Sequence, residues 1–386
     1  MLSCNGLRQL RSWGATGPSR PVPPVSPLVA QKSFGVLAIY ADAEGSLPCP
    51  SRLMISKSQS AHRPAEPTDL GSFVPPEVRS LRNPQTALPK IAKDEQLLEK
   101  IQGAVQQIPT RHDLYLGDAR QVRLRPESVH LIVTSPPYWT LKQYRDSDGQ
   151  LGHVSEYRDF LRELNKVWRK CYRALVPGGR LVCVVGDVCL SRRKNNGRHT
   201  VVPLHASIQE ACMRIGFDNL APIIWHKIAN ASYEVENGSS FLGKPYEPNA
   251  VIKNDIEFIL MQRKPGGYRQ PSIPARVLSV IGAKHHQEWF QQIWSGLTGA
   301  STRHHPAPYP LDLAERLVRM FSFVGDTVLD PFMGTGTTTV AAARWGRNSV
   351  GIELDDHYFD LGRKRIQGET NSLLSRAVVN VAPQVG

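Results

Sequence analysis

Residues 131–139, which read Leu-Ile-Val-Thr-Ser-Pro-Pro-Tyr-Trp, decide how the chain is organised. The first three residues predict the end of a buried strand. Pro136 and Pro137 then prevent both helix formation and ladder pairing, so the backbone leaves the sheet extended and stiff. The hydroxyl of Ser135, the carbonyl of Pro136 and the ring of Tyr138 form a small polar clamp beside a stacking platform. This arrangement suits a planar base with an exocyclic amino group, although a strand followed by a proline-rich turn would look the same.

A second informative stretch lies far downstream at residues 328–338, Val-Leu-Asp-Pro-Phe-Met-Gly-Thr-Gly-Thr-Thr. It predicts a strand end, a glycine loop and a helix of small residues. Gly334 and Gly336 allow a tight turn close to a ligand, and the helix that follows presents free N–H groups. The third glycine of the dinucleotide fingerprint is absent, which favours a smaller nucleoside ligand. Glu353 ends the next predicted strand and could accept two ribose hydroxyls; the alternative is an ordinary tight turn.

The two stretches together resemble a known family. Residues 134–139 resemble the catalytic motif of the amino-group DNA methyltransferases, and residues 330–337 resemble their S-adenosylmethionine loop. The catalytic motif comes first, as in the β group of that family, whose sheet is a circular permutation of the usual one. The resemblance covers residues 114–366. It implies a doubly wound, mostly parallel α/β sheet of seven strands with a target-recognition insertion.

The resemblance also implies roles for individual residues. The catalytic residues are Ser135, Pro136, Pro137 and Tyr138, and the cofactor is S-adenosyl-L-methionine. The cofactor-binding residues are Asp118, Tyr309, Asp330, Phe332, Gly334, Gly336, Thr337 and Glu353. Asp118 ends a short predicted strand and would contact the adenine, but it could instead cap a helix.

The first position of the catalytic motif bears on the target base. In the family, serine there occurs mostly with the 4-amino group of cytosine, whereas Asp or Asn occurs mostly with the 6-amino group of adenine. Ser135 therefore favours cytosine, and adenine remains the alternative because both amino groups present the same local geometry.

The net charge indicates a polyanionic partner. The chain has 47 Lys and Arg against 34 Asp and Glu, a formal charge of +13, which favours a polyanion over a solvated basic surface without a partner. Charge alone does not choose between DNA and RNA; the family resemblance implies double-stranded DNA. Two segments concentrate the charge: residues 191–199, a polar loop predicted to contact phosphate, and residues 263–303, where six basic side chains alternate with aromatics. The candidate DNA-binding residues are Arg192, Arg193, Lys194, Arg198, Arg269, Arg276, Lys284 and Arg303. The aromatics of the second segment could instead anchor it on the main domain, and Trp225 is a candidate wall for the target base or a core residue.

Cysteine spacing and hydropathy exclude other classes. The six cysteines form no C-x-x-C pair, so neither a zinc site nor a disulfide framework is indicated and no metal is expected. No apolar run is long enough to span a bilayer. These features fit a reducing, cytoplasmic location of a bacterial type.

We predict five segments. Residues 1–90 form a mostly disordered extension, 91–262 the catalytic half, 263–304 the target-recognition segment, 305–368 the cofactor-binding half and 369–386 an unstructured tail. The extension has no acid before Asp42, which resembles an organellar transit peptide. A start assigned too far upstream is the alternative we favour, since Met54 offers a later one.

Three function classes remain open at this point. The first is a DNA methyltransferase, acting as a monomer or homodimer, with a cognate restriction endonuclease as a candidate partner. An RNA methyltransferase would also need a cofactor loop and positive charge, but normally adds a recognisable RNA-binding module. A catalytically silent DNA-binding protein is disfavoured because the complete set of motif residues is present.

Overall fold

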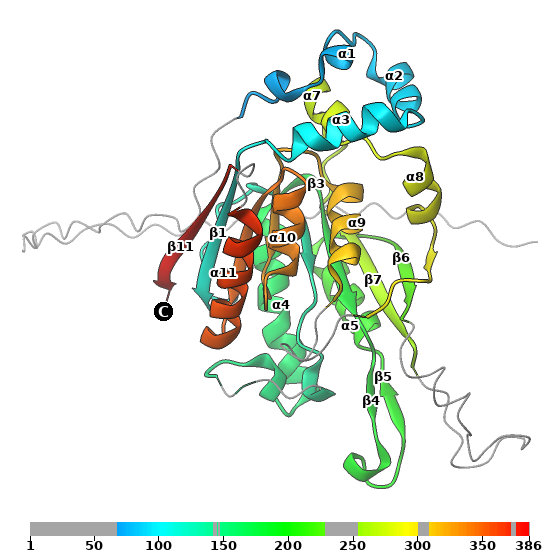
Figure 1. The fold of residues 1–386 in the computed structure, drawn as a ribbon. Helices are drawn as coiled ribbons and strands as arrows, with labels where there is room; N and C mark the ends of the chain where they lie inside the picture. Colours follow the sequence, from blue (N-terminus) through cyan, green and yellow to red (C-terminus); the bar gives the residue numbers. More distant parts are fainter. Residues whose placement is uncertain are drawn as a thin grey trace, which may run out of the picture. The chain divides into compact units, whose positions relative to one another are not determined.

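A nine-stranded sheet forms the centre of the described part of the chain (Figure 1). The structure, a computed structural model, describes residues 68–141, 145, 147–227, 254–299, 309–371 and 376–385. Across the sheet the strands are β11 (Ala377–Val385), β1 (Thr110–Gly117), β10 (Asn348–Glu353), β9 (Thr327–Asp330), β2 (Val129–Thr134), β3 (Leu175–Val185), β7 (Ile256–Arg263), β6 (Asp218–His226) and β8 (Ile293–Trp294). Within the described residues β7 pairs antiparallel with β3 and β6, and the other neighbours pair in parallel. The prediction of a mostly parallel α/β sheet is therefore confirmed.

Two strands exceed the predicted seven. β11 was predicted as an unstructured tail, but it pairs in parallel with β1 from Thr110↔Ala377 onward. Its run of Ala-Val-Val-Asn-Val suits a strand, and its partner lies far away in the sequence, which is why local patterning missed it. The two-residue β8 pairs with β6 in the segment predicted to recognise the target.

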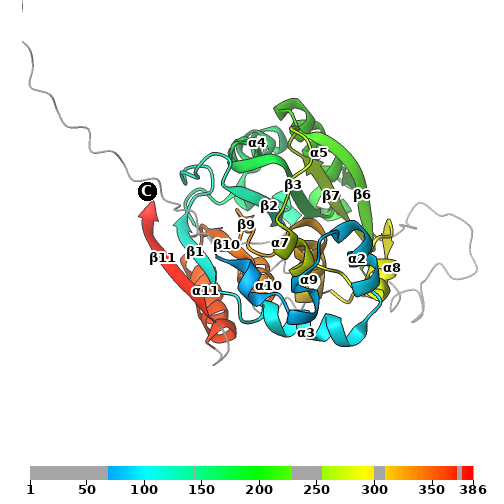
Figure 2. The ribbon, with the colours of Figure 1, turned by 90° about the horizontal axis from the view of Figure 1, so that it is seen from above.

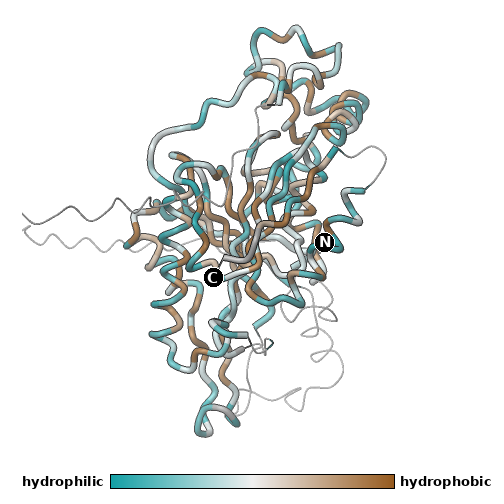
Figure 3. The backbone as a smooth tube through the Cα atoms, turned by 90° about the vertical axis from the view of Figure 1, so that its left-hand side faces the viewer, coloured by the Kyte–Doolittle hydropathy of each residue, from teal (hydrophilic) through white to brown (hydrophobic). Residues whose placement is uncertain are grey.

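Helices cover both faces of the sheet (Figure 2). On one face lie α4 (Tyr157–Ala174) and α5 (Leu204–Ile215), and on the other α9 (Leu311–Phe321), α10 (Thr337–Arg344) and α11 (Asp356–Thr370). Alternate residues of β2 serve the two faces: Ile132 packs with α4, whereas Leu131 and Val133 pack with α9. Strands buried on both faces read as continuous apolar runs, and Figure 3 shows this hydrophobic character along the central strands.

α4 carries a stripe of core residues along one face. Its members Phe160, Leu164, Val167, Trp168 and Cys171 are each at most 1 % exposed. Their helical spacing turns one face of α4 toward the sheet, and Arg and Lys side chains occupy the opposite face.

Helices also gather at the amino ends of the strands. They are a 3-10 helix (Leu70–Phe73), α1 (Pro76–Arg79), α2 (Pro84–Ile91), α3 (Glu95–Val105), α7 (Ile273–Leu278) and α8 (Ala283–Trp289). The expectation of disorder up to residue 90 is wrong for residues 68–90. Val74, Val78 and Ile91 join a hydrophobic cluster with Val277 and Val324. The caps Asp69, Asn83 and Asp94 each accept a backbone N–H and so begin these helices. Residues 1–67 lie outside the described part.

The segment predicted for target recognition is largely built into this scaffold. Trp289 and Trp294 are 4 % and 2 % exposed, and both join the cluster under α9. Trp225 is fully buried and donates its indole N–H to the carbonyl of Leu297 at 3.1 Å. The anchoring alternative therefore holds for Trp289 and Trp294, and Trp225 is the core residue of its own alternative. Residues 300–304 of the segment and the polar stretch 228–250 lie outside the described residues.

A ribbon of β4 (Val188–Leu190) and β5 (Thr200–Val202) leaves the opposite, carboxyl edge of the sheet (Figure 1). A 3-10 helix (Arg192–Lys194) lies at its tip, and two further 3-10 helices (Trp139–Leu141, Leu151–His153) follow β2. In the described residues no helix is long and apolar enough to cross a membrane.

Candidate active site

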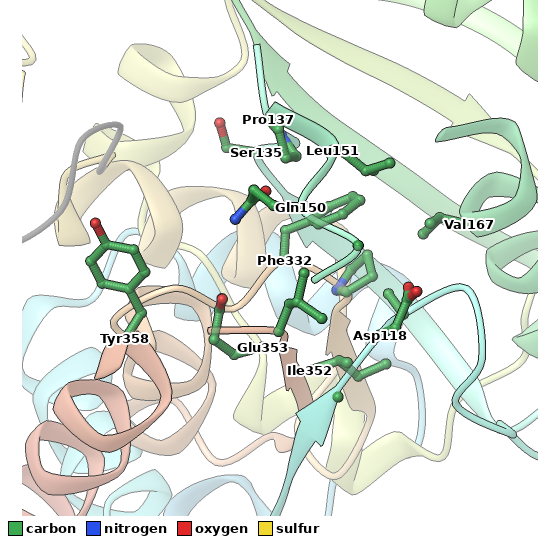
Figure 4. Close-up of a pocket in the computed structure, with 15 residues that line it drawn as sticks. Asp118, Ser135, Pro137, Gln150, Leu151, Val167, Phe332, Ile352, Glu353 and Tyr358 are labelled. Atoms are coloured by element: carbon green, nitrogen blue, oxygen red, sulfur yellow. The ribbon is translucent and has the colours of Figure 1, made fainter. Parts of the chain in front are cut away.

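A pocket opens at the carboxyl edge, where β1, β2, β9 and β10 end (Figure 4). β2 pairs directly with β9, and β9 with β10, so the proline motif, the glycine loop and the acid after them converge. The lining residues are Gly117, Asp118, Ala119, Ser135, Pro137, Gly149, Gln150, Leu151, Val167, Pro331, Phe332, Ile352, Glu353, Leu354 and Tyr358. Figure 4 shows Ser135 and Pro137 on one side, Glu353 and Ile352 on the other, and Phe332 and Gln150 between them. Carboxyl edges of parallel strands are the usual ligand sites of doubly wound folds.

Glu353 is the partly buried carboxylate at the end of β10 in this pocket. Its Oε2 accepts the N–H of Gly334 at 2.7 Å, and its Oε1 accepts the N–H of Asp355 at 2.9 Å. Burial raises its pKa to about 7, because desolvation outweighs these two bonds. Each carboxylate oxygen can accept a second hydrogen bond besides the one from a backbone N–H. Glu353 can therefore accept one hydrogen bond from each of two ligand hydroxyls.

Asp118 is held at the pocket by Arg120. The guanidinium Nε lies 2.8 Å from Asp118 Oδ2, and Nη1 and Nη2 reach Glu163 on α4 and the carbonyl of Gly149 at 2.8 and 2.9 Å. Arg120 thereby joins the end of β1, a helix and a loop around the opening. Asp118 also accepts the N–H of Arg120 at 2.7 Å. A turn and not a helix follows it, so the helix-cap alternative is wrong, and Asp118 lines the pocket.

Asp330 joins the two motifs from beneath the pocket. Its buried carboxylate accepts Thr134 Oγ1 and Thr338 Oγ1 at 2.7 Å each, Phe332 N at 3.1 Å and Tyr309 Oη at 3.2 Å. Burial raises the pKa of this carboxyl, and the four donors oppose that shift. Asp330 and Tyr309 are absent from the lining residues. Both were predicted as cofactor ligands, but their side chains fix the backbone on either side of Ser135 and Phe332.

The glycine loop has the expected left-handed conformation. Gly334 and Gly336 have φ values of 52° and 78°, and Gly336 caps α10. A Cβ on Gly336 would lie 2.7 Å from Ile366 Cδ1. Thr337 Oγ1 accepts Arg365 at 3.0 Å. Of the predicted loop ligands, only Phe332 lines the pocket directly.

Ser135 and Tyr138 are hydrogen-bonded to each other. Ser135 Oγ donates to Tyr138 Oη at 3.2 Å. Ser135 and Pro137 line the pocket, whereas Pro136 does not. Tyr138 is only 5 % exposed, so the open stacking platform predicted from the sequence is covered in this structure. Its ring packs against Gly186 and Glu257, which lie where β3 ends and β7 begins.

The predicted DNA-binding residues divide between opposite edges of the sheet. Arg192, Arg193 and Arg198 are exposed at the tip of the β4–β5 ribbon, at the carboxyl edge. Lys194 lies in the same tip, but its side chain and the whole of Arg303 fall outside the description. The tip, predicted to be a polar loop, is a turn in which Asn195 Nδ2 donates to the carbonyl of Arg198 at 3.1 Å.

Arg269, Arg276 and Lys284 lie instead near the amino edge. Arg269 pairs with Asp326 just before β9 at 2.7 Å, and Arg276 and Lys284 are on α7 and α8. The six residues of β2 separate the two edges by about 20 Å. The structure therefore does not bring these three side chains together with the catalytic motif.

Several pocket residues have no signal in the sequence. Gly149, Gln150 and Leu151 come from a loop between β2 and α4 that carries no motif. Tyr358 was assigned to a helix without a role. Ala119 and Leu354 were predictable from the sequence, because each directly follows a predicted site residue at the end of a strand. Among the described residues no cluster of His, Cys, Asp and Glu could hold a metal ion.

The sheet, the glycine turn and the acids at adjacent strand ends define a nucleoside-binding protein of the doubly wound α/β class. Comparison with known proteins narrows this class. The model of the N6/N4 methyltransferase family, described as DNA methylase, matches residues 129–364. The chain belongs to this family.

Similar sequences and structures agree with the assignment. The Type II methyltransferase M.MjaI of Methanocaldococcus jannaschii is 36% identical over 280 residues, 64% of this chain and 88% of that protein. M.MthZI of Methanothermobacter thermautotrophicus is 34% identical over 293 residues, 70% of this chain and 80% of that protein. The crystal structure of TTHA0409, a putative DNA modification methylase from Thermus thermophilus complexed with S-adenosyl-L-methionine, is 51% identical, with a TM-score of 0.57 over 70% of this chain and 100% of that one.

Proposed function

We propose that this protein transfers a methyl group from S-adenosyl-L-methionine to the 4-amino group of a cytosine flipped out of duplex DNA. The coarser statement, a site-specific DNA methyltransferase of the N4/N6 amino class, follows from the family and its Type II relatives. The observation that supports the reaction most directly is that Ser135 and Pro137 share one pocket with Asp118 and Glu353.

The pocket fits S-adenosyl-L-methionine. Glu353 offers two carboxylate oxygens to the ribose hydroxyls, and Asp118 offers an acceptor to an adenine amino group. Phe332, Ile352 and Val167 provide apolar surface for the adenine ring. The Thermus relative binds the same cofactor. Bound there, the cofactor supplies an electrophilic sulfonium methyl group.

Catalysis rests on positioning. An exocyclic amino nitrogen is a poor nucleophile because its lone pair is delocalised into the ring. Ser135 Oγ and the carbonyl of Pro136 accept the two amino hydrogens, which favours a pyramidal nitrogen and directs its lone pair toward the methyl group. The Asp330 bond to Thr134 fixes the residue before Ser135.

The target base has to leave the duplex, at a cost of a few kcal/mol. Stacking on Tyr138 would return about 1–3 kcal/mol. Because the ring is covered in this structure, entry of the base requires a local rearrangement of its neighbours. We assign DNA backbone contact to the β4–β5 tip, which lies at the same edge of the sheet as the pocket.

The relatives are Type II modification enzymes. We propose a cytoplasmic protein whose partner is double-stranded DNA, with a cognate restriction endonuclease as a second candidate partner. The order of the two motifs along the chain supports the permuted β-group arrangement.

The test is transfer of labelled methyl groups to duplex DNA and to RNA, followed by nucleoside mass spectrometry. We expect 4-methylcytosine in DNA. Finding only 6-methyladenine would contradict the choice of cytosine and leave the enzyme class intact. Transfer to RNA alone, or no transfer by a protein that binds the cofactor, would contradict the proposed function.

A further inference from the structure

A chain of polar contacts continues from the catalytic motif away from the cofactor pocket. Ser135 Oγ donates to Tyr138 Oη at 3.2 Å, and Tyr138 Oη lies 3.4 Å from Glu257 Oε2. The other oxygen of Glu257 accepts Lys227 Nζ at 2.8 Å. Ser135 follows β2, Lys227 follows β6 and Glu257 begins β7, so three strands contribute to the chain at one edge of the sheet.

The carboxylate of Glu257 is largely shielded from water. Its side chain is 13% exposed, and that of Lys227 is 31% exposed. A Cβ on Gly186 would lie 3.4 Å from Glu257 Cγ and 3.5 Å from the Tyr138 ring, so this glycine leaves room for the two side chains to meet. Within the part of the chain that the structure describes, the charged and titratable groups bonded to the Glu257 carboxylate are the Lys227 ammonium, which follows β6, and the Tyr138 phenol beyond β2. The next carboxylate along the chain, Asp255, is paired with His226 at 3.2 Å instead.

The phenol has one hydrogen, and Val184 and Glu257 are two acceptors that lie near it among the described residues. Tyr138 Oη is 3.4 Å from Glu257 Oε2 and also 3.4 Å from the carbonyl of Val184. The charged carboxylate is the stronger acceptor. Both contacts are long, which is common for catalytic hydrogen bonds before the substrate binds. When the phenol donates its hydrogen to Glu257, the phenol oxygen accepts from Ser135 Oγ, and the lone pairs of Ser135 Oγ remain available as acceptors for a target amino group.

We propose that Glu257 acts through Tyr138 and Ser135 as the terminal proton acceptor for methyl transfer. This proposal rests on the proposed function. The nitrogen lone pair forms the new N–C bond while the bond between sulfur and methyl breaks, and its electron pair stays on sulfur. One amino proton passes to Ser135 Oγ, the serine proton passes to Tyr138 Oη, and the phenol proton passes to Glu257 Oε2. Glu257 later releases its proton to solvent, so atoms and charge balance without a further reactant.

Lys227 has a supporting role in this scheme. Its ammonium is fixed by Glu257 Oε1 and lies 5.3 Å above the Trp225 ring. The charge-assisted hydrogen bond from the ammonium holds Glu257 Oε1 in place and so keeps Oε2 turned toward the phenol. The alternative is that the pair merely joins the ends of β6 and β7, in which case its loss would affect stability and not the chemical step.

The experiment compares Glu257→Gln, Tyr138→Phe and Glu257→Asp with a matched control, Asp255→Asn, in single-turnover and steady-state assays over a range of pH. Asp255→Asn removes a neighbouring ion-paired carboxylate that does not reach the motif. We expect Glu257→Gln and Tyr138→Phe to lower kcat by about 100-fold with KM for both substrates little changed. The acidic limb of the kcat profile should disappear in Glu257→Gln, while Glu257→Asp restores part of the rate.

Distinct outcomes separate the two proposals. If wild-type protein transfers no methyl group, the proposed function fails. If wild-type protein is active and Glu257→Gln keeps its kcat and pH profile, the relay alone is overturned. The relay is also overturned if Asp255→Asn lowers kcat as much as Glu257→Gln does. It is overturned as well if Glu257→Gln lowers both kcat and the melting temperature but keeps the pH profile of the wild type. Should Glu257→Gln fail to fold, Tyr138→Phe, which removes one oxygen, decides by the same criteria.

Discussion

Glu353 carries the clearest pH dependence at the scale of single residues. Burial raises its pKa to about 7 from an ordinary 4.5. Ribose hydroxyls donate to the ionised form, so cofactor affinity should fall as the pH drops below about 7, by up to tenfold per pH unit. Calorimetric titration from pH 5.5 to 8.5 measures this. Glu353→Gln should bind weakly and without that slope; an unchanged slope would contradict the assignment.

The raised pKa of Glu353 makes cofactor affinity increase with pH, but it makes the unfolding free energy of the cofactor-free protein decrease with pH. The native state binds this proton more tightly than the unfolded chain, so the contribution of Glu353 to the unfolding free energy is full below about pH 4.5. It is lost as the pH rises through about 7. The stability difference between wild type and Glu353→Gln across this range isolates the effect, and cofactor should offset it.

Asp330 predicts a coupling between stability and catalysis. Thr134→Val removes one of the four donors to a buried carboxylate and keeps the side-chain shape. We expect a loss of about 1–3 kcal/mol in unfolding free energy and a lower kcat, because the residue before Ser135 loses its anchor. Urea unfolding and single-turnover rates measure the two effects. Thr339→Val, a neighbouring buried threonine on α10, is the control; a Thr134→Val enzyme with wild-type kcat would show that the anchor does not matter for catalysis.

The sequence predicts the residues of this site better than their contacts. Ser135, Asp118, Phe332 and Glu353 were predicted and line one pocket, because motif spacing locates strand ends. The roles of Asp330 and Tyr309 were not predictable, since whether a side chain faces a ligand or its neighbours depends on packing between strands. Nothing in the sequence indicated Glu257, which reaches Tyr138 only because β7 is the antiparallel neighbour of β3.

At the scale of elements, the β4–β5 ribbon should control DNA affinity. The variant Arg192→Ser/Arg193→Ser/Arg198→Ser removes three charges from the tip without touching the pocket. We expect weaker binding to duplexes of any sequence, a salt dependence reduced by nearly three in its log–log slope, and unchanged cofactor affinity. Fluorescence anisotropy at several salt concentrations measures this.

Arg276→Ser supplies the control for the ribbon. It removes a basic side chain on α7 near the amino edge, which duplex DNA at the pocket does not reach. Its salt slope should match that of the wild type. If instead Arg276→Ser weakens binding and the ribbon variant does not, DNA contacts the amino edge and our placement of the duplex is wrong.

Helices and strands were predictable from the sequence where the pattern of their own residues indicates the secondary structure. The stripe of α4 and the apolar runs of β2 and β3 need no knowledge of partners. β11 and the helices between residues 68 and 91 were missed because short segments obtain their stability from distant contacts, with β1 in one case and with α7 in the other. The basic and aromatic segment 263–299 has the composition of a DNA-contacting region, yet its tryptophans pack into the core.

At the scale of the whole molecule, the buried cluster at the amino edge predicts which truncation lowers stability, since all its members lie after residue 67. Deleting residues 1–67 should leave the melting temperature and methyl transfer near those of the full chain. Deleting residues 1–91 removes Val74, Val78 and Ile91 from a buried cluster and should lower stability by several kcal/mol. Thermal melting and activity of the two variants measure the difference; equal stability would show that the amino-edge helices are dispensable.

The place of β1 between β10 and β11 has a consequence for protein synthesis. A ribosome makes β1 and the catalytic motif early, then needs roughly 10–50 s more to reach β10 and β11 at ordinary elongation rates. Until then both edges of β1 lack their partners, and Ser135 has no cofactor loop beside it. A nascent chain is therefore inactive toward the DNA of its own cell, and products of premature termination expose strand edges that favour aggregation.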